Sequence, residues 1–187
     1  MAGQDASPAG LAHDQSGAVE PHAGTARKPR LHRSASAPVL IVQIEPDSVN
    51  ARAMVGVVLE ALDGTQSTGH LCRSVAELGR RVNSIEAACM VIPVSGQSLE
   101  AHIAAIESLA TIAPALRRIL VGQPSLRKDP YLADFLMRGL LYDFMVLPQE
   151  LREFELALRR TSHLASIEAE TRRSAMEIVP SESQMVG

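Results

Sequence analysis

The side chains that most often perform chemistry are thinly spread in this sequence. His70, His102 and His163 each stand alone, and no Gly-x-Ser-x-Gly turn supplies a nucleophile, so we predict surface or capping histidines. Cys72 and Cys89 form no Cys-x-x-Cys pair and have no histidine at zinc-finger spacing. We therefore expect no disulfide and no metal, but two reduced, partly buried thiols of a cytoplasmic protein.

Motifs for binding phosphate or bases are missing as well. Neither G-x-G-x-x-G nor G-x-x-x-x-G-K-[ST] occurs, and with 3% aromatic residues and no Trp the chain offers few surfaces for stacking. A net charge of −3 gives no general attraction to nucleic acid or anionic membrane. No apolar run approaches the roughly 18 residues of a membrane span. These observations predict a protein that is not an enzyme, needs no cofactor and binds neither membrane nor nucleic acid.

The composition predicts one globular domain with tails, because 46% of the residues are hydrophobic and 21% are charged. Residues 1–37 lack apolar periodicity and are predicted to be a disordered tail. Residues 38–160 form the predicted domain, and residues 161–187 a helical extension with a frayed end. Charges alternate in that extension, which suits either a solvated helix or a weak coiled coil that links to a second subunit.

Strand and helix patterns alternate along the domain. Buried strands are predicted at Val39–Val42, Ala88–Ile92, Ile119–Val121 and Tyr142–Val146, with a weaker strand at Gly69–Cys72. Helical patterns follow each strand, with Asp47 or Ser48, Ser74 and Ser98 as capping residues. Five strands alternating with five helices predict a doubly wound parallel sheet, which is a three-layer α/β/α sandwich of the flavodoxin-like kind.

Two segments resemble bacterial response-regulator receiver domains. The run from Val39 to Asp47 resembles their opening, where an apolar strand leads into an acidic cluster and a helix. The run from Gly139 to Pro148 and the Leu-rich helix after it resemble the receiver pattern that ends in Lys-Pro, although the spacing is one residue longer. The similarity covers about Pro38 to Arg160, and it implies a receiver-like fold.

The residues that a receiver needs for phosphorylation are replaced here. The resemblance places Pro93 where the phosphoacceptor aspartate should end the third strand, Gly122 in place of the Ser or Thr, and Leu147 in place of the lysine. Mg²⁺ requires several hard anionic oxygens, and the acidic pair expected to hold it is replaced. Gln43 and Ile44 occupy the places of that pair. Only Glu45 remains, and we predict that it is a solvated residue at a strand end.

The resemblance also implies a docking surface and a cis Leu147–Pro148 peptide bond. Receiver domains usually dock or dimerise through the region of the fourth helix and fifth strand. Here that region carries the apolar side chains Tyr131, Phe135, Leu136 and Met137. Core packing is the alternative explanation for two of these four.

The leading hypothesis is a pseudo-receiver that works in signalling without phosphorylation and binds other proteins, a second copy of the chain among them. The alternative hypothesis is a small-molecule sensor on the same fold. Its ligand would bind at the apolar carboxyl edge of the sheet, near Gln43, Pro93, Gly122 and Leu147.

Overall fold

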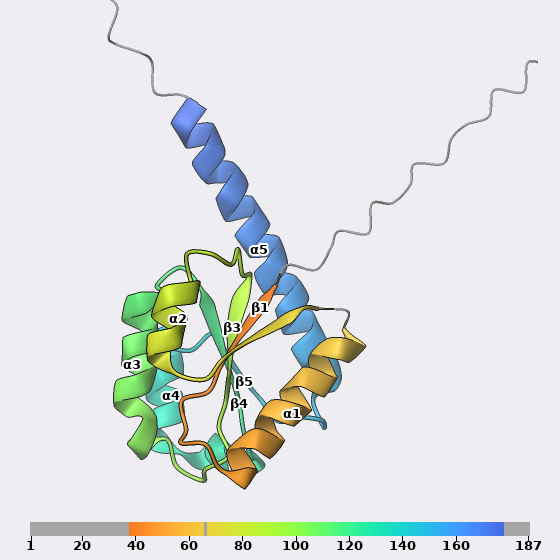
Figure 1. The fold of residues 1–187 in the computed structure, drawn as a ribbon, viewed down its shortest axis with the longest axis vertical. Helices are drawn as coiled ribbons and strands as arrows, with labels where there is room; N and C mark the ends of the chain where they lie inside the picture. Colours follow the sequence, from red (N-terminus) through yellow and green to blue (C-terminus); the bar gives the residue numbers. More distant parts are fainter. Residues whose placement is uncertain (1–37, 66, 178–187) are drawn as a thin grey trace, which may run out of the picture. The chain divides into compact units, whose positions relative to one another are not determined.

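The computed structural model describes residues 38–65 and 67–177, which form a five-stranded parallel sheet covered by helices on both faces (Figure 1). The strand order is β2-β1-β3-β4-β5. The strands are β1 (Val39–Val42), β2 (Gly69–Cys72), β3 (Cys89–Pro93), β4 (Arg117–Val121) and β5 (Asp143–Met145). The helices are α1 (Val49–Gly64), α2 (Val75–Arg81), α3 (Ile103–Ile112), α4 (Pro130–Met137) and α5 (Leu151–Glu177), with 3₁₀ helices η1 (Glu100–His102) and η2 (Pro124–Lys128). The predicted three-layer architecture is confirmed, whereas the tail predicted for residues 1–37 and the end at 178–187 lie outside the described residues.

Two hydrophobic cores lie on opposite faces of the sheet, because neighbouring strand residues point to opposite sides. Leu40 of β1 packs in the core under α2, α3 and α4, whereas Ile41 packs in the core under α1 and α5. Figure 1 shows the same division of the helices. Burial on both faces is the reason that the central strands are almost continuously apolar.

Helix starts follow the capping prediction at α1 and depart from it at α3. The Ser48 hydroxyl accepts a hydrogen bond from the Ala51 amide at 3.1 Å, which satisfies a free donor of the first turn. The Ser98 hydroxyl accepts from the Glu100 amide at 3.2 Å, but the first turn there is the 3₁₀ helix η1, and α3 begins only at Ile103.

Strand β4 begins at Arg117, two residues before the predicted start, because Arg117 and Arg118 already pair with β3. The charged side chain of Arg118 is nevertheless buried. Its guanidinium donates hydrogen bonds to three carbonyl oxygens: those of Leu140 at 2.6 Å, Ala113 at 3.0 Å and Gly139 at 3.2 Å. Sequence patterns do not reveal such partners, which come from the end of α3 and from the turn after α4. Gly139 has a φ of +68°, a conformation that glycine adopts without strain.

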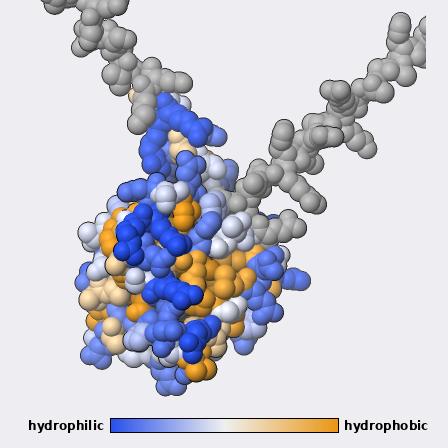
Figure 2. Space-filling view, viewed as in Figure 1, coloured by the Kyte–Doolittle hydropathy of each residue, from blue (hydrophilic) through white to orange (hydrophobic). Residues whose placement is uncertain are grey.

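Helix α5 runs from Leu151 to Glu177, through the predicted helical extension, and is about 40 Å long at 1.5 Å per residue. Its first part is buried against the sheet up to Thr161. The remainder continues past the edge at which the strands begin (Figure 1), and its surface is mostly hydrophilic (Figure 2). Within the described ranges, no helix has the length and apolarity needed to cross a membrane.

Candidate functional site at the carboxyl ends of the strands

The carboxylate of Glu45 lies at the carboxyl end of β1 and binds the loop that follows β3. Its Oε2 accepts hydrogen bonds from the Ser95 amide at 2.8 Å and from the Ser95 hydroxyl at 2.7 Å. Its Oε1 accepts from the Gly96 amide at 2.9 Å and lies 3.4 Å from Nε2 of His102. We call these four residues, Glu45, Ser95, Gly96 and His102, the Glu45 cluster.

One prediction from the sequence is wrong at this cluster: the side chain of Glu45 is only 8% exposed, so it is not a solvated residue at a strand end. His102, predicted to be a surface or capping residue, is the N-cap residue of α3, but its side chain is 12% exposed and makes no capping hydrogen bond. The reason is tertiary: β1 and β3 are neighbours, so the residues that follow them meet although they are 50 positions apart in sequence. Each bond joins a carboxylate to a donor, and such charge-assisted bonds are stronger than neutral ones.

Side chains from two further elements hold the same loop. Gln123, after β4, donates from Nε2 to the carbonyl oxygen of Ser95 at 2.9 Å. Asp129, the capping residue of α4, accepts from the Leu99 amide at 2.9 Å and from the Tyr131 amide at 2.9 Å. The loop between β3 and η1 is therefore attached to β1, to the β4 end and to α4 at once.

The other predicted positions of the degenerate phosphorylation site are filled by packing. Pro93 is buried at the end of β3, and Leu147, 7% exposed, packs in the core on the α1 and α5 side. A side chain at Gly122 would displace Leu126, because a Cβ atom there would lie 2.5 Å from Cδ1 of that buried leucine. The cis peptide bond between Leu147 and Pro148 is present, as the resemblance implied.

Gln43 and Ile44 do not form a metal site with Glu45. The amide of Gln43 is buried and donates to the backbone carbonyl of Glu45 at 3.3 Å, while Ile44 packs against the core. In the described part of the chain, no group of three or more His, Cys, Asp or Glu side chains is arranged to hold a metal ion.

Sequence reasoning missed the roles of Ser95, His102, Gln123 and Asp129. One signal was available for Asp129, because an aspartate directly before Pro130 is a common start of a helix. The other three carry no pattern in the sequence, since their partners come from elements that only the sheet order brings together.

The predicted docking residues on α4 divide between surface and core. Phe135 is fully buried and stacks against Tyr131 at 6.3 Å between ring centroids, so Phe135 belongs to the core and is removed from the predicted surface. Tyr131 is half-buried, Leu136 is 38% exposed and Met137 is 82% exposed. Helical spacing explains the division, because residues 132 and 135 face the sheet and residues 136 and 137 face away.

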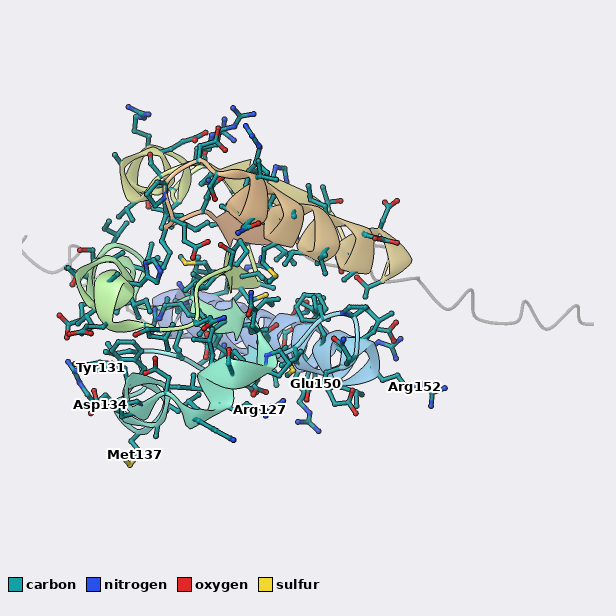
Figure 3. All side chains as sticks on the ribbon, turned by 90° about the horizontal axis from the view of Figure 1, so that it is seen from below. Arg127, Tyr131, Asp134, Met137, Glu150 and Arg152 are labelled. Atoms are coloured by element: carbon teal, nitrogen blue, oxygen red, sulfur yellow. The ribbon has the colours of Figure 1, made fainter. Side chains whose placement is uncertain are left out.

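Charged side chains lie on α4 and on the elements next to it. Arg127 forms an ion pair with Glu150, and Arg138 pairs with Asp134 at 3.1 Å. Figure 3 shows Tyr131, Asp134 and Met137 along α4, with Arg127, Glu150 and Arg152 on the neighbouring elements. We call Tyr131, Leu136 and Met137 the α4 patch.

Comparisons with known proteins agree with this architecture. No protein-family model matches the sequence, and no curated protein sequence matches it. Among solved structures, it is similar to a CheY-like protein, TadZ, from Pseudomonas aeruginosa PAO1, with 17% identity and a TM-score of 0.51 over 66% of this chain and 98% of that one. It is also similar to the signal receiver domain of a modulated diguanylate cyclase from Desulfovibrio desulfuricans G20, with 12% identity and a TM-score of 0.51 over 71% and 98%. The chain therefore has a receiver-like fold.

Proposed function

We propose that this protein is a signalling module of the receiver type that works in the cytoplasm without phosphorylation and acts by binding other proteins, with no catalytic role of its own. The observation that carries the proposal is the Glu45 cluster, in which Glu45 binds Ser95 and Gly96. A carboxylate of the protein itself occupies the strand edge where a receiver would bind a phosphoryl group, and it binds the loop there through three hydrogen bonds. Two free, buried thiols fit a reducing compartment.

Phosphoryl chemistry would lack its partners at this edge. An acyl phosphate requires a carboxylate at the end of β3, and Pro93 supplies none. The phosphoryl oxygens would need a hydroxyl and an ammonium group, but Gly122 has no side chain and Leu147 is part of the core. The remaining carboxylate, Glu45, already accepts bonds on both of its oxygens.

Incubation with acetyl phosphate and with beryllofluoride, each with Mg²⁺, tests the proposal. We expect intact-mass spectrometry to show no added phosphoryl group, and amide NMR spectra to show no change near Ser95 and Gly96. A stoichiometric aspartyl phosphate would overturn the proposal, and mapping it would show which carboxylate accepts the group.

The α4 patch is the surface that we propose for docking, and a second copy of this chain is the proposed occupant. Exposed apolar side chains next to paired charges have the composition of a protein interface. The charges on α4 and the neighbouring elements carry both signs, Arg127 with Glu150 and Arg138 with Asp134, so the same surface of a second copy offers complementary charges.

Truncation of the patch separates docking from folding. We expect a Leu136→Ala, Met137→Ala double variant to keep its thermal stability but to raise the dissociation constant of the dimer by about 30-fold or more, since interface hot spots contribute roughly 2 kcal/mol. Val49→Ala is the matched control, because Val49 is an exposed apolar residue (74%) on α1. Sedimentation analysis of the full chain measures both variants. A monomeric wild-type protein, or equal weakening by the control, would place the docking surface elsewhere.

A further inference from the structure

A groove of about 600 Å³ lies at the edge of the sheet opposite to the Glu45 cluster. The residues before and at the start of β4 form one wall, and the turn between α4 and β5 with Tyr142 forms another. The projecting part of α5 closes the third side with Glu168, Thr171 and Arg172. The groove thus joins the sheet to the only part of α5 that continues past it.

Positive charge predominates in this groove. Three arginines line it, Arg117, Arg118 and Arg172, and Glu168 is the single acidic residue among the lining side chains. Arg117 and Glu168 form an ion pair at 2.7 Å and neutralise one another. Two guanidinium groups, those of Arg118 and Arg172, are therefore left without an acidic partner among the described residues.

Arg118 makes this excess charge unusual, because only 7% of the residue is exposed to solvent. Its guanidinium bonds only neutral carbonyl oxygens, one from each nitrogen, and these bonds use three of its five N–H groups. Burial lowers the pKa of Arg118, since the charged form loses water there. A buried charge without a counter-charge is unfavourable, so an anion beside it would be strongly stabilised.

The remaining lining indicates what accompanies the anionic group. The half-buried Leu116 and Tyr142, a residue that is 40% exposed, supply apolar surface, and Thr171 supplies a hydroxyl. A volume of this size is typical of sites for small organic ligands and exceeds the needs of a simple ion. Arginine forks match the oxygens of phosphate groups in two-bond geometry.

We infer that this groove binds a small phosphorylated organic molecule, with its phosphate at Arg118 and Arg172 and its organic part against Leu116 and Tyr142. The bound molecule links the start of β4 to the projecting part of α5. Binding therefore holds that part of α5 against the sheet. This ligand site lies at the opposite edge from the one that the sequence suggested for a sensor, and it is independent of the proposed lack of phosphorylation.

Titration of the full chain followed by amide NMR tests the inference. The probes are AMP, ribose 5-phosphate, inorganic phosphate and, as a carboxylate without phosphorus, succinate. We expect AMP or ribose 5-phosphate to bind with a Kd below about 1 mM, to shift the amides of Arg117, Gly139 and Tyr142, and to slow amide exchange near Thr171. Inorganic phosphate should bind more weakly at the same amides, because it lacks the organic part.

Two neighbouring arginines of α5 provide a matched pair of variants. Arg172→Ala removes a charge that lines the groove, and we expect it to raise the Kd about tenfold or more. Arg173→Ala removes the same charge from the next residue of the helix, which does not line the groove, and we expect less than a twofold change. Equal effects of both variants, binding of succinate as tight as that of the phosphorylated probes, or no shifts up to about 10 mM of any probe would each overturn the inference.

Discussion

Removal of the Glu45 carboxylate should release the loop that follows β3. In the Glu45→Ala variant, the Ser95 amide, the Ser95 hydroxyl and the Gly96 amide lose their acceptor. Hydrogen bonds to a charged group contribute about 1.5–3 kcal/mol each, so three bonds at the lower end amount to about 4.5 kcal/mol. Because all three share one carboxylate and water replaces part of them, the effects are not additive, and we expect a loss of about 2–4 kcal/mol.

Urea unfolding and amide hydrogen exchange measure this effect at two levels. The free energy of unfolding should fall by that amount. The amides of Ser95 and Gly96 should exchange roughly 30- to 700-fold faster, because local opening becomes easier by the same free energy. Glu45→Gln keeps one carbonyl oxygen as an acceptor, so it should fall between the wild type and Glu45→Ala.

Asp47→Ala is the control, because this carboxylate comes from the same segment but is 66% exposed and pairs only with the exposed Arg52 at 3.3 Å. Exposed pairs contribute little, so we expect a change below about 1 kcal/mol. If Glu45→Ala were no more destabilising than Asp47→Ala, or if the loop amides kept their protection, the carboxylate would not hold the loop and the argument for a closed site would fail.

Three further outcomes are expected. Gly122→Thr restores the hydroxyl of a receiver but places its Cβ 2.5 Å from Leu126, so urea unfolding should show a loss of about 1–3 kcal/mol, partly recovered by adding Leu126→Ala. Burial raises the pKa of the Cys89 thiol from 9.0 to about 11, so the stability that the thiol contributes is complete below pH 9 and is lost as the pH rises to 11. A comparison of unfolding free energies across that pH range should show a decline larger by about 2–3 kcal/mol in the wild type than in Cys89→Ala. Deletion of residues 1–37 should leave the melting temperature unchanged, and a fall of several degrees would show that this segment contributes to the fold.

The sequence by itself determined the layers of this protein. Apolar runs such as Val39–Val42 are buried on both faces, and this follows from local composition, because a strand between two helical layers has no polar side. The alternation of such runs with helical periods leaves few topologies, since crossovers between parallel strands are right-handed. The residue types at the positions that the resemblance compares with a phosphorylation site, Pro93 and Leu147 among them, were also read directly from the sequence.

Only the tertiary structure decided how the charged side chains at the two edges of the sheet are held. The sequence shows Glu45 as a single carboxylate, and its partner Ser95 is 50 residues away with no pattern that links the two. Likewise, no pattern in the sequence indicates the carbonyl partners of Arg118, which come from two separate turns. Periodicity indicates on which side of its own helix or strand a residue lies, but contacts between loops depend on which strands become neighbours. That order is set by the packing of the whole sheet.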